Sequence, residues 1–181
     1  MGCGCGKKAA ESAAVVASTI IHSMETTEWG PVFWKVLHCF SIRVGFIGDR
    51  LIDTDQARSM ELLIGLLGDV LPCETCQRHF KEWIGGHSLG FVGTYGSQLR
   101  CAIELWLLNF HNAVRGRLGA SIEVNTVAEY EALYKGCKIE KCEIDMLGRA
   151  AKYAIDRNII KPSTWKRWFT EFKKLKVMLG A

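Results

Sequence analysis

Apolar residues recur with the period of an α-helix in four successive segments, and this pattern constrains the fold more than any other feature. We expect a first helix over 28–44 and a second that begins at a cap at Asp53 or Asp55 and ends at Leu71. The third covers 72–83 and the fourth covers 98–118. Their inward positions are Phe33, Leu37 and Phe40; Met60, Leu63, Ile64, Leu67 and Leu71; and Ile103, Leu107, Phe110, Val114 and Leu118. Such helices, joined mostly by short connections, predict an all-α four-helix bundle.

The composition supports one compact helical protein. Only three of the 181 residues are proline, and 49% are hydrophobic, which is enough for a sizeable core. The net charge of +4 is mild, so we expect no nucleic acid as partner. Polar residues interrupt the apolar ones near the start of the sequence, so we expect no secretory signal. No apolar run reaches the roughly 18 residues that cross a bilayer.

Three parts are expected along the chain. Residues 1–25 form a leader with an alanine-rich stretch that favours a helix, residues 26–120 the bundle, and residues 121–181 a C-terminal helical extension. In the extension we expect three helices. The first covers 126–135 after a cap at Asn125, the second follows Cys142 and ends near residue 158, and the third covers 163–179. The last helix is basic, with an apolar face of Trp165, Trp168, Phe172, Leu175 and Leu179. This face is expected to pack on the bundle or on a partner subunit, and peripheral contact with a membrane is the alternative.

The motif Pro72-Cys73-Glu74-Thr75-Cys76 places two thiols at a predicted helix start, because proline is tolerated in a first helical turn. Free N–H groups and the positive dipole end would stabilise a thiolate there. By itself the motif fits a redox-active dithiol, half of a zinc site or a haem attachment. Gln77 stands where covalent haem attachment needs histidine, which makes haem the weakest of the three.

Polar side chains on inward helix faces point to a ligand. His111 lies on an apolar face with Asn112 and Arg115 beside it, and Trp34 and His38 are one turn apart on another helix. A hydrogen-bonded core histidine is the simpler explanation for His111 alone. Buried polar groups need partners, however, and a polar aromatic ligand between the helices would serve all five residues.

Three blocks of sequence resemble the Erv/ALR family of flavin-linked sulfhydryl oxidases. They read WGPVFWKVLH from Trp29 to His38, PCETC from Pro72 to Cys76 with Phe80 after it, and LW at 105–106 followed by FHNAV at 110–114 and LG at 118–119. Each block alone is weak, but their joint occurrence in this order is specific. The resemblance covers 28–119, about half of the chain.

The resemblance implies a bundle that holds FAD between its helices, with Cys76 next to the flavin and Cys73 exchanging with incoming dithiols. Electrons would pass from protein dithiols, or from a thioredoxin-like carrier, through this pair to FAD and then to molecular oxygen, with hydrogen peroxide as product. It also implies a homodimer. Carried over by position, the cofactor-binding residues are Trp34, His38, His111, Asn112 and Val114, and, with less support, Trp29, Gly30, Pro31, Arg117 and Leu118.

Two departures from the family pattern bear on this interpretation. Arg115 replaces the second asparagine of the histidine–asparagine block, and we expect its guanidinium to contact the FAD phosphates. Leu108 stands where cellular members have a structural cysteine, and compact members from large DNA viruses also lack that cysteine. We therefore expect a viral protein in the cytoplasm of an infected cell or in the virion, with the mitochondrial intermembrane space as the alternative.

The other cysteines leave several interpretations open. Cys3 and Cys5 form either a shuttle disulfide on a flexible arm or acylation sites next to a myristoylated Gly2, although Gly6 breaks the myristoylation pattern. Cys137 and Cys142 are expected to close a small loop as a structural disulfide. Cys39 and Cys101 are expected to be inert, buried core residues.

Two alternative functions remain at this stage. A zinc-binding interaction module would use Cys73, Cys76 and His79, with His87 as a further ligand. A purely structural bundle with inert thiols is the other. Neither accounts for the tryptophan–histidine and histidine–asparagine blocks.

Overall fold

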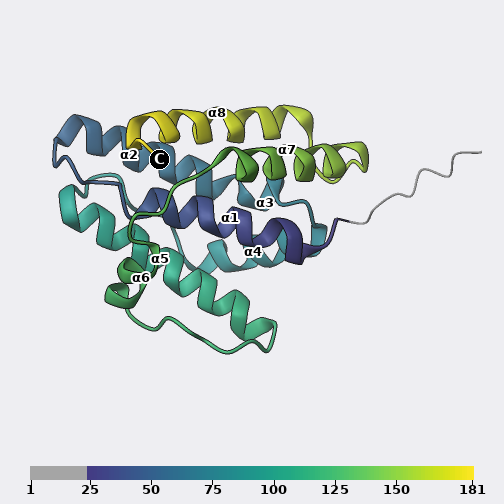
Figure 1. Ribbon diagram of the computed structural model, residues 1–181, viewed down its shortest axis with the longest axis horizontal. Coiled ribbons are helices and arrows are strands. Elements are labelled where there is room, and N and C mark those ends of the chain that lie inside the picture. The colour runs from purple at the N-terminus through teal and green to yellow at the C-terminus, as the bar shows by residue number, and fades with distance from the viewer. Residues whose placement is uncertain (1–23) are drawn as a thin grey trace, which may run out of the picture.

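The computed structural model describes residues 24–181, and these residues form eight helices without a β-sheet (Figure 1). The helices are α1 (Thr26–Ser41), α2 (Arg50–Gly65), α3 (Leu67–Val70), α4 (Glu74–Gly86), α5 (Gly96–Arg117), α6 (Val127–Tyr134), α7 (Lys141–Asp156) and α8 (Pro162–Leu179). The predicted all-α class is confirmed. The predictions for the leader, including Gly2, Cys3 and Cys5, lie outside the described residues. None of the described helices combines the length and the apolar character needed to span a bilayer.

The helical pattern identifies most of the core correctly. Phe33, Leu37 and Phe40 on α1 are at most 4% exposed, and the five predicted positions between Met60 and Leu71 are all buried. The helix expected to run to Leu71 is divided at Leu66 into α2 and the short α3. Leu118 was predicted to face inward, but it is 77% exposed because α5 ends one residue before it.

Two predicted helix caps are wrong because a neighbouring side chain reaches the free N–H groups instead. Asp49 caps α2, and its Oδ1 accepts hydrogen bonds from the N–H groups of Leu51 and Ile52 at 2.9 and 3.0 Å. Asp53 is fully buried, and its Oδ2 accepts from the N–H of Gly96 at 2.7 Å, which joins α2 to the start of α5.

The cap of α6 also differs from the expected Asn125. Thr126 is the N-cap, and its hydroxyl accepts a hydrogen bond from the N–H of Glu129 at 3.2 Å. The Glu129 carboxylate reaches back to the N–H groups of Asn125 and Thr126 at 2.8 and 3.2 Å, which completes a capping box. This fixes the start of α6 one residue later than predicted.

The C-terminal extension covers the bundle. Figure 1 shows α8 running along α2 and α7 beside α1, and both pairs are in contact. Trp168, Phe172 and Leu175 of the predicted apolar face are at most 1% exposed. The indole N–H of Trp168 donates to the carbonyl oxygen of Leu63 in α2 at 3.0 Å. The face therefore packs on the chain's own bundle, the first of the predicted arrangements.

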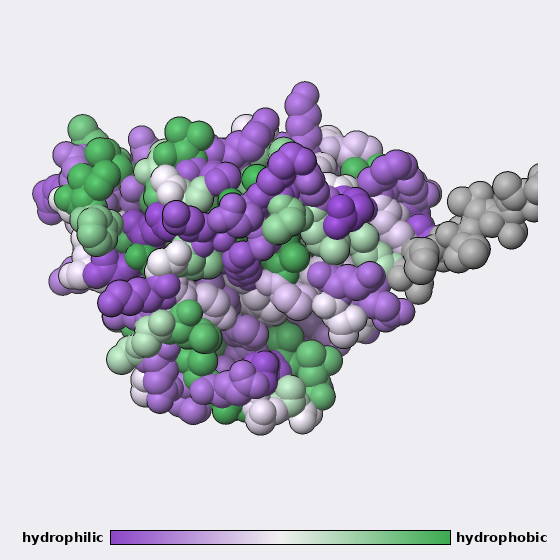
Figure 2. Space-filling model, viewed as in Figure 1, coloured by the Kyte–Doolittle hydropathy of each residue, from purple (hydrophilic) through white to green (hydrophobic). Residues whose placement is uncertain are grey.

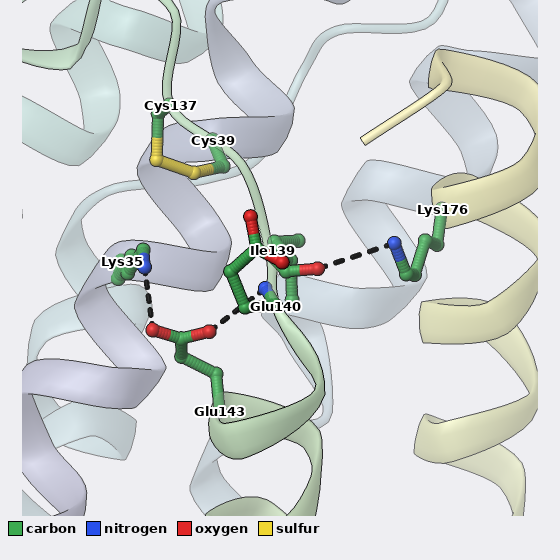
Figure 3. A network of polar contacts seen from close by, with 7 residues as sticks. All are labelled: Lys35, Cys39, Cys137, Ile139, Glu140, Glu143 and Lys176. Atoms are coloured by element: carbon green, nitrogen blue, oxygen red, sulfur yellow. Dashed lines mark hydrogen bonds and ion pairs between the residues drawn. A yellow bond between two sulfur atoms is a disulfide. The ribbon is translucent and has the colours of Figure 1, made fainter.

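A disulfide between Cys39 and Cys137 links α1 to the segment before α7 (Figure 3). This disulfide and the exposure of the free cysteines correct three predictions. Cys137 does not pair with Cys142, which is free and exposed in the first turn of α7. Cys39 is buried but is not an inert thiol, and Cys101 is exposed on α5 where a core position was expected.

Polar contacts hold the same segment against the bundle. Lys35 Nζ lies 2.5 Å from Glu143 Oε1, and Lys176 Nζ donates to the carbonyl oxygen of Ile139 at 3.3 Å (Figure 3). Arg43 Nη2 donates to the carbonyl oxygen of Cys137 at 2.6 Å. The first turn of α7 is thus tied to α1, and the segment before it is tied to Arg43 and to α8 as well as through its disulfide.

One face of the surface is mostly hydrophilic, with apolar side chains gathered at the end where α2 begins (Figure 2). Phe46 and Ile47 in the connection before α2, and Leu51 in its first turn, are 81%, 63% and 79% exposed. These are the largest exposed apolar side chains near that end of the bundle.

Loss of the Cys39–Cys137 disulfide is expected to lower the free energy of unfolding by about 2–5 kcal/mol, because the bond closes a long loop in the unfolded chain. Cys137→Ala makes this change, and chemical denaturation without reductant measures it. Cys142→Ala is the control, since its thiol is free, and should unfold like the parent. Equal destabilisation by the two variants would show that the predicted Cys137–Cys142 pair forms instead.

Candidate active site

The two cysteines of the Cys-x-x-Cys motif lie at the start of α4 and form a disulfide. The helix begins at Glu74, two residues after the predicted start, because Cys73 is its N-cap. The backbone N–H of Cys76 donates to Cys73 Sγ at 3.2 Å. Both cysteines are partly exposed. A sulfur that accepts this hydrogen bond at a helix N-terminus is stabilised when it carries negative charge.

Contacts on three sides fix the position of α4. The Gln77 amide group donates to the carbonyl oxygens of Leu71 at 2.9 Å and Ile159 at 3.3 Å. α3 approaches closely at Gly68, where an added Cβ would lie 2.9 Å from Lys81 Cγ and 3.2 Å from Phe80 Cδ1. The disulfide therefore rests on a helix that both the bundle and the extension hold in place.

Aromatic side chains connect α4 with the centre of the bundle. Phe110 of α5 is buried, and its ring centroid lies 5.3 Å from Phe80 and 5.9 Å from Trp83, both on α4. On its other side, Phe110 lies 5.1 Å from Trp34 of α1. A continuous aromatic contact therefore joins the disulfide-bearing helix to the predicted cofactor residues.

Three of the predicted cofactor residues form a stack of rings. Trp34 and His111 lie 4.1 Å apart between centroids with an angle of 8° between their planes, and Trp34 and His38 lie 5.5 Å apart at 11°. The structure thus brings together the two histidines predicted from separate sequence blocks. A Trp–His stack of this kind presents aromatic faces suited to a planar heterocycle.

The histidines are also hydrogen-bonded to each other and to the extension. His38 Nε2 lies 3.1 Å from His111 Nδ1, and His38 Nδ1 lies 2.5 Å from the hydroxyl oxygen of Tyr130 in α6. The ring of Tyr134 lies 4.3 Å from that of His38. Neither tyrosine was predicted to lie at this site, although their spacing of four residues on one predicted helix is a signal for a shared face.

The two histidines are neutral at neutral pH. Burial and, to a smaller extent, the neighbouring His111 together lower the pKa of His38 to about 3. The pKa of His111 is about 4, because burial and then Arg115 lower it while Glu123 opposes them. Neutral imidazoles each carry one N–H donor and one acceptor nitrogen.

The remaining predicted residues have other surroundings. Asn112 Nδ2 donates to the carbonyl oxygen of Val124 at 2.9 Å. Arg115 donates to the carbonyl oxygen of Ser121 and to Glu123, both at 2.6 Å, so its guanidinium is engaged within the chain. Both side chains hold the segment before α6 against α5.

The other predicted cofactor-binding residues lie apart from the stacked rings of Trp34, His38 and His111. Gly30 is half-buried, Pro31 and Leu118 are exposed, and Arg117 lies 3.4 Å from Glu82. Trp29 is buried and lies against Phe33, and Val114 is half-buried. The structure groups Trp34, His38 and His111 closely and does not group these residues with them.

The residues present fit a flavin by their chemistry. The stacked rings offer aromatic faces, and the buried indole N–H groups of Trp29 and Trp83 have no hydrogen-bond partner within the described residues. A cavity of about 60 Å³ lies beside His111 and Tyr134 and is lined by side chains of both α5 and α6.

The zinc interpretation gains no support. Within residues 24–181, no three histidine, cysteine or acidic side chains are grouped closely enough to hold a metal ion. Cys73 and Cys76, the first two proposed ligands, are bonded to each other.

The lowered pKa values of His38 and His111 predict a pH-dependent stability. Because the folded state binds fewer protons than the unfolded state, their contribution is fully present above about pH 6.5, the ordinary histidine value, and is lost as the pH falls toward 4. Glu104, whose pKa burial raises to about 7, acts in the opposite direction.

The difference between two variants isolates the histidine contribution. His111→Gln should lose less unfolding free energy than the parent between pH 7 and pH 5, as measured by denaturation at each pH. His79→Gln, a substitution on α4 outside the ring stack, should follow the parent. An identical pH dependence for the parent and His111→Gln would contradict the burial argument.

Comparisons with known proteins bear on the whole arrangement. The family model described as Erv1 / Alr family matches residues 31–133. A protein of Invertebrate iridescent virus 3, whose name provisionally assigns it as an FAD-linked sulfhydryl oxidase, is 33% identical over 101 residues, which cover 53% of this chain and 60% of that protein. The chain thus spans less than two thirds of this relative.

Other viral relatives match a larger share of their own length. The FAD-linked sulfhydryl oxidase of African swine fever virus is 26% identical over 107 residues, 59% of this chain and 80% of the relative. A Frog virus 3 protein with a name of the same kind is 25% identical over 118 residues, 65% of this chain and 75% of the relative. No solved structure matches this chain.

The matched segment runs from the second turn of α1 into the last turn of α6. It includes the Cys73–Cys76 disulfide, the aromatic contact through Phe110 and the stack of Trp34, His38 and His111. It covers more than half of the 181 residues. The chain therefore belongs to the Erv1/Alr family.

Proposed function

We propose that this protein is an FAD-dependent thiol oxidase that forms disulfide bonds in protein dithiols. The single observation that supports this most is the Cys73–Cys76 disulfide at the N-terminus of α4, joined through Phe110 to the stack of Trp34, His38 and His111. Membership of the Erv1/Alr family and relatives named as FAD-linked sulfhydryl oxidases support the same activity.

The thiol chemistry consists of two exchange steps at the Cys73–Cys76 disulfide. A substrate thiolate attacks Cys73 Sγ, the Cys73–Cys76 bond breaks, and Cys76 leaves as a thiolate. The second substrate thiolate attacks the substrate sulfur of the mixed disulfide, and Cys73 leaves. The N–H of Cys76 donates to Cys73 Sγ, which makes Cys73 the more stable thiolate and the better leaving group in this step.

The substrate is thereby oxidised by two electrons, and the cysteine pair is reduced. FAD held between the helices would supply the acceptor for these two electrons and the accompanying protons, with molecular oxygen as the final acceptor and hydrogen peroxide as the product. We assign the cofactor contacts to Trp34, His38 and His111. Asn112 and Val114 follow on the same helix, and Trp29 supplies a buried N–H. Cys76 is assigned to the flavin side of the pair.

The wider setting is also a proposal. We take residues 26–120 as the oxidase bundle, with a leader before it and the helical extension after it, and we propose a homodimer that acts on protein dithiols or on a thioredoxin-like carrier. The named viral relatives favour a protein that acts in an infected cell. Cys3 and Cys5 are assigned either to a shuttle disulfide or to acylation, with an idle leader as the third possibility. An added myristoyl mass in protein from eukaryotic cells supports acylation, and loss of turnover on protein clients in Cys3→Ser/Cys5→Ser supports the shuttle.

Purified protein should be yellow, with a flavin spectrum that dithiothreitol bleaches under nitrogen and air restores. Cys73→Ser and Cys76→Ser should each reduce oxygen consumption with dithiothreitol to the background rate while FAD remains bound, because each removes one half of the exchanging disulfide. Oxygen uptake and flavin absorbance measure the two properties separately.

Cys101→Ser and Cys142→Ser are the matched controls, since both thiols are free and exposed. Both variants should turn over at the parent rate. Retained turnover in Cys73→Ser or Cys76→Ser would show that another pair carries the reaction. A colourless protein that binds no FAD would overturn the proposed function.

A further inference from the structure

We propose that Tyr130 of the extension is a positioning residue that sets the tautomers of His38 and His111, so that His111 offers an acceptor nitrogen to the cofactor. This inference rests on the proposed function for the identity of the cofactor, but the tautomers are properties of the chain itself. Tyr130 is assigned no direct contact with the reacting atoms.

Tyr130 connects three groups in the core. Its side chain is 1% exposed, and its hydroxyl oxygen lies 2.5 Å from His38 Nδ1 and 2.7 Å from Ser41 Oγ. Ser41 Oγ in turn lies 2.9 Å from the carbonyl oxygen of His38. His38 and Ser41 are both fully buried, so these contacts have no competition from solvent.

Counting protons gives this chain of hydrogen bonds one direction. A carbonyl oxygen only accepts, so the single hydroxyl proton of Ser41 is donated to the carbonyl of His38. Ser41 Oγ must then accept from Tyr130, which uses the single hydroxyl proton of Tyr130. The hydroxyl oxygen of Tyr130 is left to accept from His38, so the proton of His38 is on Nδ1.

The same order of donors and acceptors determines the tautomer of His111. A neutral His38 with its proton on Nδ1 has an acceptor at Nε2, so the N–H of this contact belongs to His111 Nδ1. His111, which lines the small cavity beside Tyr134, is then left with a lone pair on Nε2. This nitrogen accepts from an N–H or O–H group, such as the imide, adenine amino or hydroxyl groups of FAD, and does not suit a phosphate oxygen.

The extension is built to bring this hydroxyl to the core. The capping box at Thr126 and Glu129 fixes the start of α6, and Asn112 holds the preceding segment at Val124. After α6, the disulfide from Cys137 to Cys39 returns the chain to α1, one residue from His38. Tyr130 is therefore held from both sides of its helix.

Two-bond proton–nitrogen NMR correlation of the full chain, recorded near pH 7 before and after FAD is added, tests the inference. In the parent, His38 and His111 should both show the pattern of a proton on Nδ1. In Tyr130→Phe, which keeps the ring and removes the hydroxyl, the nitrogen shifts of His38 should move toward the tautomer protonated on Nε2. The dissociation constant for FAD should rise about fivefold, as expected for one lost hydrogen bond.

Tyr134→Phe is the control, because Tyr134 contacts the same imidazole through its ring. It should leave the tautomers of both histidines unchanged. A parent spectrum with the His38 proton on Nε2 would overturn the inference, as would unchanged tautomers in Tyr130→Phe. Because the spectrum without FAD reports the tautomers by itself, a protein that lacks oxidase activity would refute the proposed function without deciding this one.

Discussion

The structure depends on the need to satisfy two imidazoles inside an apolar core. An unpartnered buried polar group costs about 1–3 kcal/mol, so His38 and His111 can face the interior only where other polar atoms meet them. They meet each other, and the Tyr130 hydroxyl, which Ser41 also contacts, meets the remaining buried nitrogen of His38. The position of α6 on the bundle follows from this requirement, because no residue of α1 or α5 is hydrogen-bonded to His38 Nδ1.

Burial also determines the chemical state of the site. A protonated imidazole is disfavoured where water is excluded, and both histidines are consequently neutral. A neutral imidazole has one N–H donor and one acceptor nitrogen. In a chain of such hydrogen bonds, the proton position on one histidine therefore determines the proton position on the next. At the Cys-x-x-Cys motif, by contrast, partial exposure admits a substrate and a backbone N–H stabilises one sulfur. The buried cluster suits a cofactor, and the half-exposed disulfide suits exchange with another protein.

The extension stabilises the bundle and completes its polar core. α8 packs an aromatic face on α2, and the Cys39–Cys137 disulfide joins the segment before α7 to α1. Both contacts follow α6 in the chain, and Asn112 and Arg115 hold the segment that precedes it. Residues beyond the predicted bundle therefore contribute directly to the candidate cofactor site, which agrees with a family match that extends to residue 133.

Features that depend on local spacing could be predicted from the order of the amino acids. Helical periodicity identified the core positions of α1, α2 and α8, and the three blocks with the Cys-x-x-Cys motif identified the family and the residues that stack at the centre. The partner of Cys137 follows from how the helices pack, because Cys142 is close in sequence while Cys39 is 98 residues away and close in space. The role of Tyr130 was decided in the same way, since a tyrosine on a short helix has no visible partner until folding places it against His38. Local patterns record which side chains share a face, whereas pairing between distant side chains depends on how the helices pack.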